Sequence, residues 1–61
     1  QVESFERAFA QLEPEEREIV LMARIERLTH AEIAARHGTT EEASRKTLSR
    51  AMVRLASFMQ Q

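Results

Sequence analysis

Apolar side chains recur at helical spacing through most of the chain, and the residues that interrupt them divide it into four segments. The first segment, SFERAFAQL, sets charged residues between four apolar ones, Phe5, Ala8, Phe9 and Leu12. Pro14 ends this segment and begins a second helix. Proline is tolerated at the first helical position because a backbone N–H there would have no intrahelical hydrogen-bond partner. The pattern therefore predicts one helix before Pro14 and another that starts at it.

The second segment contains a run of apolar residues long enough to cover every side of a helix. Its centre, IVLMA at residues 19–23, places apolar side chains in unbroken succession. A helix of this kind is usually surrounded by its neighbours. We therefore expect it at the centre of the domain, ending near Arg27.

The third segment, LTHAEIAARHG, has clear signals at both ends. Thr29 and Glu32 form a capping box, in which each side chain satisfies a backbone N–H of the other residue. Ile33 and Ala34 are expected to point inward, and Gly38 ends the helix because it tolerates a positive φ. The result is a helix of about eight residues, which is too short to persist without packing.

The fourth segment starts at Thr39 or Thr40. Thr40 would be a plain N-cap, whereas Thr39 with Glu42 would make a second capping box, and the pattern leaves both open. An apolar stripe runs along the helix through Leu48, Ala51, Met52, Leu55, Phe58 and Met59. The opposite side carries Arg45, Lys46, Ser49 and Arg50. We therefore expect a long amphipathic helix with a basic outer face.

Composition agrees with an all-α domain, because the chain has one glycine and one proline and is rich in helix formers. We expect residues 1–61 to form a single small domain, and the start at Gln1 suggests a fragment of a longer protein. No apolar run is long enough for a membrane span. The absence of cysteine is compatible with the cytoplasm and excludes disulfides and thiolate metal sites.

The formal net charge of −1 hides an asymmetry between the two halves of the chain. Residues 1–32 sum to −4, whereas residues 33–61 sum to +3. A basic half of this kind is the electrostatic footprint of a nucleic-acid-binding protein.

A short capped helix, a tight turn with glycine and a long basic helix together indicate a helix-turn-helix without a wing. Ala34 supplies the small residue where the helices cross, and Gly38 supplies the left-handed turn. The long helix could then enter the major groove of DNA. Arg45, Lys46 and Arg50 lie on its exposed face, and Arg54, one turn further on, could reach a phosphate.

LEPEEREIVLMARIERLTHAEIAARHG followed by TLSRAMVRL resembles region 4 of bacterial RNA polymerase sigma factors, especially the extracytoplasmic-function group. The resemblance implies recognition of the minus-35 promoter element in double-stranded DNA and docking on the flap of the polymerase β subunit. It also implies a possible anti-sigma factor as a partner. It matches Thr40, Arg45, Lys46 and Arg50 to positions that meet DNA. Together with Glu41, Ser49 and Arg54, these are the candidate DNA-binding residues. The resemblance assigns the structure of the helix-turn-helix to Thr29, Ile33, Ala34, Gly38 and Leu48.

The chain departs from the family pattern where polar residues replace apolar ones, at His37, Thr39 and Ser44, and where Thr47 replaces a frequent arginine. Burial of a polar group without a partner is costly, so these residues either find local partners or loosen the helix pair. They motivate a second hypothesis, a degenerate sigma-like module that binds an anti-sigma factor, the polymerase flap or itself. A third hypothesis is the DNA-binding output domain of a quorum-sensing regulator.

Catalytic and metal chemistry find little support in the sequence. His30 and His37 have no cysteine or aspartate near them, and Ser44 and Ser49 have neither a neighbouring histidine nor oxyanion-hole glycines. We therefore expect no enzymatic activity, no cofactor, no metal and no small-molecule substrate.

Overall fold

The computed structural model describes residues 2–60, which form an all-α domain as predicted. The element order is α1 (Val2–Ala10), α2 (Pro14–Val20), a π-helical turn η1 (Leu21–Ile25), α3 (His30–His37) and α4 (Glu41–Met59). No strand, and hence no wing, is present within these residues. Within residues 2–60, no helix combines the length and the apolar composition that a membrane span requires.

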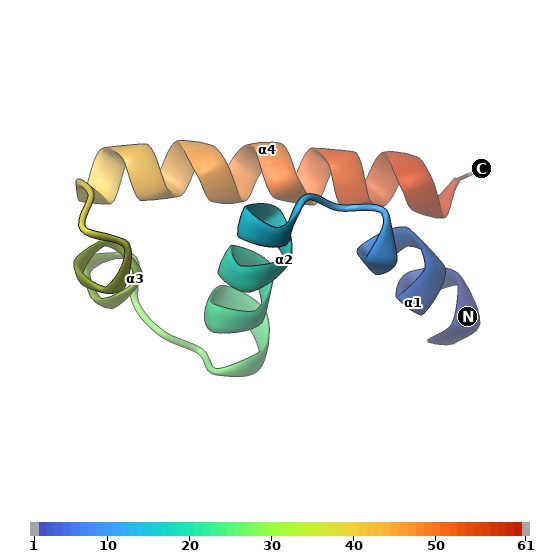
Figure 1. Ribbon diagram of the computed structural model, residues 1–61, viewed down its shortest axis with the longest axis horizontal. Helices are drawn as coiled ribbons and strands as arrows, with labels where there is room; N and C mark the ends of the chain where they lie inside the picture. The colour runs from blue at the N-terminus through green and yellow to red at the C-terminus, as the bar shows by residue number, and fades with distance from the viewer. Residues whose placement is uncertain (1, 61) are drawn as a thin grey trace.

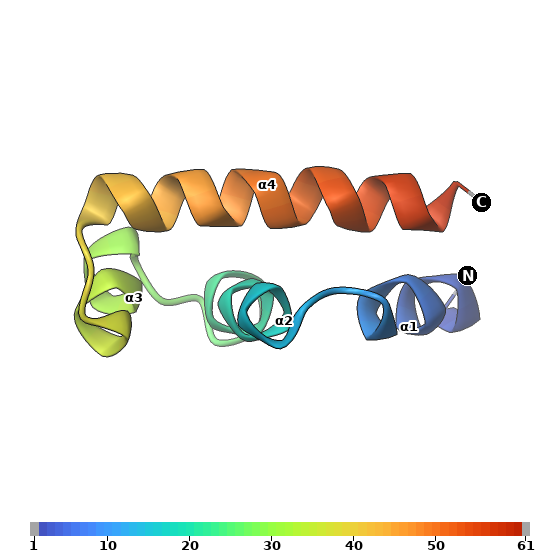
Figure 2. The ribbon, with the colours of Figure 1, turned by 45° about the horizontal axis from the view of Figure 1, so that its top comes forward.

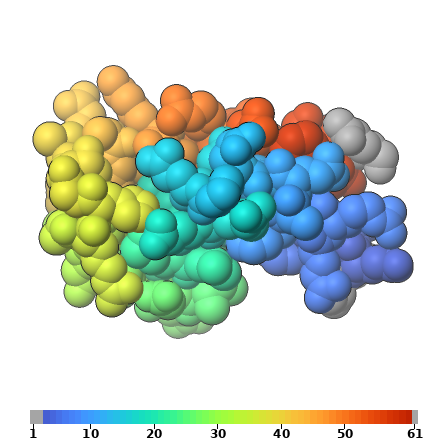
Figure 3. Space-filling model, in the orientation of Figure 1, coloured from blue at the N-terminus to red at the C-terminus, as the bar shows by residue number. Residues whose placement is uncertain are grey.

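The long helix α4 lies along one side of the molecule, and the shorter helices follow one another along its length (Figures 1 and 2). α3 packs near the N-terminal end of α4, α2 near its middle and α1 near its C-terminal end. In the space-filling view the three form one continuous layer below α4 (Figure 3). The domain is consequently elongated, with extents of 32 × 18 × 15 Å.

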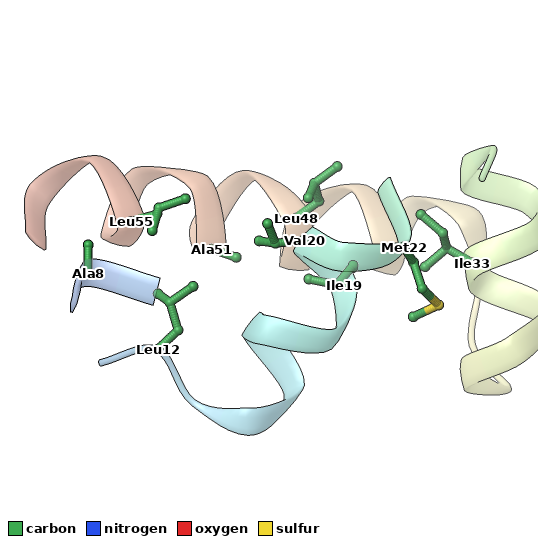
Figure 4. Packing of buried hydrophobic residues seen from close by; sticks show 9 residues of the cluster. All are labelled: Ala8, Leu12, Ile19, Val20, Met22, Ile33, Leu48, Ala51 and Leu55. Atoms are coloured by element: carbon green, nitrogen blue, oxygen red, sulfur yellow. The ribbon is translucent and has the colours of Figure 1, made fainter. Parts of the chain in front are cut away.

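The core fills the space between α4 and this layer (Figure 4). Leu48, Ala51 and Leu55 supply the α4 side, and every other segment adds at least one buried apolar side chain. Those partners are Ala8, Leu12, Ile19, Val20, Met22 and Ile33. Burial of the larger of these side chains contributes on the order of 1.5–3 kcal/mol each. Since α1, α2 and α3 all pack against α4, this helix holds the domain together.

Two expectations about the core need correction. The second helix is central, but it is not buried all round, because Leu21 is 41% exposed. Phe5 and Met59 are also exposed, although both were expected on apolar stripes. Phe5 instead stacks on Phe9, with ring centroids 5.7 Å apart, and Met59 lies in the final turn of α4.

The connection between α1 and α2 is held by side chains of the second helix. α1 ends at Ala10, before Pro14 is reached, and the Leu12 N–H donates to the Phe9 carbonyl. Arg17 Nη1 then donates to the carbonyl of Leu12 at 2.6 Å and to that of Ala10 at 3.3 Å. The end of α1, whose carbonyls lack helical partners, is thereby fastened to α2.

The end of the second helix differs from an ordinary α-helix. In η1 the Glu26 N–H donates to the Leu21 carbonyl, five residues back, which is the π-helical pattern. Arg27 follows with a φ of 59°, and the Leu28 N–H closes the turn by donating to the Met22 carbonyl. The predicted end near Arg27 is therefore correct, while the π-helical turn was not predicted.

The caps of the last two helices are those that local sequence signals favoured. Thr29 Oγ1 accepts from the Glu32 N–H at 3.1 Å, and Glu32 Oε1 accepts from the Thr29 N–H at 2.8 Å. The open choice at α4 falls on Thr40, whose Oγ1 accepts from the Ala43 N–H at 3.1 Å.

Candidate nucleic-acid interface

The joint between α3 and α4 has the conformation expected of a helix-turn-helix. Gly38 has a φ of 64°, its N–H donates to the Ala35 carbonyl, and the Thr39 N–H donates to the Ala34 carbonyl. This pair of bonds is a Schellman motif, which ends a helix and reverses the chain. α3 is seen end-on in Figure 1 while α4 lies across the page, so the two helices cross steeply.

Buried residues of both helices hold this crossing in place. Ile33 and Ala34 of α3 are buried, as predicted, and so is Leu48 of α4. Because successive buried positions on α4 follow the helical period, the residues between them are turned away from α3.

Three polar residues, His37, Thr39 and Ser44, lie at or beside the same joint, and they differ in burial. Ser44 is only 2% exposed, and its Oγ has no hydrogen-bond partner among residues 2–60. His37 is half-buried, with Nε2 3.4 Å from Glu18 Oε1, while Thr39 is exposed. His37 therefore has a nearby carboxylate on α2. Ser44, by contrast, places a hydroxyl without a hydrogen-bond partner at the contact between α3 and α4.

The outer side of α4 presents a basic face, which we define as Arg45, Lys46, Ser49 and Arg50. All four residues are exposed. Arg45 Nη2 lies 3.7 Å from Glu41 Oε1, an exposed pair of the kind that contributes little to stability. Within residues 2–60 no carboxylate forms an ion pair with Lys46 or Arg50. These cations are consequently available to an anionic partner.

Arg54, which was expected one turn beyond the basic face and within reach of a phosphate, contacts other side chains of the domain. Its Nε lies 2.9 Å from Glu16 Oε2, and its guanidinium carbon lies 5.3 Å from the centre of the Phe58 ring. Glu16 is 8% exposed and also accepts from the Glu13 N–H at 2.8 Å. These contacts favour a structural role for Arg54 in fastening α4 to α2.

Beside the basic face lies a hollow that sequence reasoning missed. This groove between η1, α3 and α4 has a volume of about 400 Å³ and is lined by Arg24, His30, Arg45, Leu48, Ser49, Met52 and Val53. Arg24 and His30 come from segments far from α4 in the sequence, so no spacing pattern could have joined them to it. The groove thus brings two further basic side chains close to Arg45 and Ser49.

The two histidines lie at opposite ends of α3, and no group of three or more metal-ligating side chains comes together in the described part of the chain. The remaining candidates, Thr40 and Glu41, lie at the start of α4. The structure therefore places the predicted DNA-binding residues on α4 or at its N-cap, and among them Arg54 is paired with Glu16 of α2.

Comparison with known protein families gives one match. The family described as sigma-70, region 4, matches residues 3–55, a range that includes the core, the joint at Gly38 and the whole basic face. Neither a curated protein nor a solved structure gives a significant match to the chain.

Proposed function

The chain belongs to the sigma-70 region 4 family, and on this premise we propose that it recognises the minus-35 element of promoters. The family is a DNA-binding and polymerase-interacting one that acts in transcription, and it is not a family of enzymes. In this proposal residues 1–61 are the C-terminal domain of a longer sigma factor, which docks on the flap of the polymerase β subunit.

The observation that carries the proposal is the basic face of α4, held outward by the joint at Gly38. A major groove admits one α-helix, and the recognition helix of a helix-turn-helix reads bases with its N-terminal residues. Lys46 is suited to guanine, while Arg45 and Arg50 are suited to phosphates on either side of the helix. Only this face needs to be basic, which explains how a chain with a net charge of −1 can bind DNA.

Thr40, Glu41 and Ser49 complete the proposed interface. Thr40 and Glu41 lie at the N-terminal end of α4, where the helix dipole favours a phosphate. The Glu41 carboxylate can accept from the amino group of cytosine, and the Ser49 hydroxyl can donate to a phosphate.

Docking on the polymerase is proposed for a different surface. Ile25, which is 67% exposed, and Leu21 lie four residues apart in η1 and present apolar side chains to solvent. Exposed apolar side chains next to one another are typical of protein-binding surfaces.

Binding to a fluorescent promoter duplex, measured by anisotropy in the full-length factor, tests the proposal. Removing the side chain of Arg45 or Lys46 should weaken binding, and loss of a phosphate contact should lower the salt slope by about one. Arg7→Ala is the matched control, because Arg7 is an exposed arginine on α1, far from α4 in the sequence, that pairs with Glu3. Absence of salt-dependent binding even at low ionic strength would contradict the proposal.

A second candidate function is a protein-interaction module that binds an anti-sigma factor. The unmatched Ser44 hydroxyl in the helix joint favours it, because a loosened joint positions a recognition helix less well. Tight partner binding that survives Arg45→Ala and Lys46→Ala, together with no measurable DNA affinity, would support this candidate over promoter recognition.

A further inference from the structure

The groove beside the basic face is lined by basic side chains from three different elements. Arg24 on η1 and Arg45 on α4 reach it from two elements, and Arg24 forms no ion pair within residues 2–60. His30 also lines it, and its Nδ1 is a buried atom with no hydrogen-bond partner among the described residues. Two guanidinium groups and an imidazole therefore surround a space that holds no carboxylate side chain among its lining residues.

The rest of the lining is suited to the sugar that accompanies a phosphate. Ser49 adds a hydroxyl, and Met52 and Val53 add an apolar wall, with Val53 69% exposed. A nucleic-acid backbone alternates charged phosphates with less polar sugars, so a mixed cationic and apolar groove matches it.

The groove adjoins both the basic face and the start of α3. Arg45 and Ser49 belong both to the basic face and to the groove, so the two surfaces are continuous. When a recognition helix occupies a major groove, the first helix of the pair crosses the sugar-phosphate backbone. His30 is the first residue of α3, which is that first helix here.

We propose that this groove holds one backbone phosphate of the bound duplex, clamped between Arg24 and Arg45, with His30 as a further donor. The inference rests on the proposed function and extends its interface beyond α4 to η1 and the start of α3. The phosphate displaces Glu41 from its weak, exposed pair with Arg45.

The experiment uses Arg24→Ala and His30→Gln in the full-length factor, with Arg36→Ala as the matched control. Arg36 is an exposed arginine of α3 that pairs with Glu26 and does not line the groove. Affinities for a promoter duplex and for a scrambled duplex are measured by anisotropy over a range of salt concentrations. Circular dichroism melts establish that each variant is folded.

We expect Arg24→Ala to weaken binding to both duplexes alike, by about three- to tenfold, and to lower the salt slope by about one, because a phosphate contact is blind to sequence. His30→Gln should weaken both duplexes in the same direction and by less. In a second experiment, single phosphates of the duplex are replaced one at a time by neutral methylphosphonates. At one position the replacement should weaken binding of the wild type and leave the affinity of Arg24→Ala unchanged.

Other outcomes separate this inference from the function on which it rests. If Arg24→Ala binds like Arg36→Ala while Arg45→Ala is weakened, the groove is not a phosphate site and promoter recognition stands. If Arg45→Ala is also unaffected, the proposed function fails. If Arg24→Ala retains DNA affinity and loses binding to the polymerase or an anti-sigma factor, the groove serves an acidic protein segment, and the inference is overturned.

Discussion

Glu16 and Arg54 connect the first turn of α2 to the C-terminal half of α4, with Arg54 Nε 2.9 Å from Glu16 Oε2. The same carboxylate accepts from the Glu13 N–H at the start of α2, so one buried side chain both caps a helix and joins it to another. A buried carboxylate in this position is hydrogen-bonded by protein donors instead of water, so loss of Arg54 leaves it without one of its donors.

Glu16→Ala should lower the free energy of unfolding by about 1–2 kcal/mol, because it removes the cap and the partner of the half-exposed Arg54. Urea denaturation measures this change. Glu15→Ala is the control, since Glu15 is an exposed acid in the same turn and loses only its interaction with the helix dipole. A double-mutant cycle with Arg54→Ala should show coupling between the two residues, and additive effects would contradict the role described for the pair.

Ser44→Ala should raise the free energy of unfolding by about 1 kcal/mol, because it removes a buried hydroxyl without a partner and has a higher helix propensity. Ser57→Ala, at an exposed position of the same helix, separates the two contributions, since only propensity changes there. A Ser44→Ala variant that is no more stable than Ser57→Ala would show that the hydroxyl is satisfied in solution.

Gly38→Ala should lower the free energy of unfolding by about 1–2 kcal/mol, because the left-handed backbone conformation is unfavourable for alanine. The φ of 64° is unfavourable for alanine, whereas an added Cβ would have no neighbouring atom within 4 Å. Thermal melts of Gly38→Ala and Gly38→Asn provide the measurement, and asparagine should be the milder change because it tolerates the left-handed region. Equal losses for both variants would point to crowding at the turn instead.

Arg27→Gly should stabilise the domain by about 0.5–1 kcal/mol, because Arg27 is a non-glycine residue with a φ of 59°. Arg27→Ala removes the same side chain and keeps the backbone cost, so it should have little effect. The difference in unfolding free energy between the two variants isolates the backbone term. A glycine variant no more stable than the alanine variant would mean that the positive φ carries no cost at this turn.

Features that depend on neighbouring residues were predictable from the sequence. Thr29 and Glu32 cap α3 because they are three positions apart, and Gly38 ends it because the chain must turn there. The cap of α4 was limited to Thr39 or Thr40, and the structure selects Thr40.

Features that depend on tertiary packing were not predictable. The pair of Glu16 and Arg54 joins residues that are 38 positions apart. Arg54 was expected to be within reach of a phosphate because helical spacing alone cannot show a partner on another helix. The π-helical turn has no local signal in the apolar run that contains it. The groove at Arg24 exists only because η1, the start of α3 and α4 lie around the same space.

α4 has a packed side and an exposed side, so the positions needed for folding differ from the positions that can be substituted. Leu48, Ala51 and Leu55 are buried in the core, whereas the exposed positions between them do not contribute to core packing. Substitutions at those exposed positions therefore carry little folding cost, and new target preferences can arise on an unchanged framework.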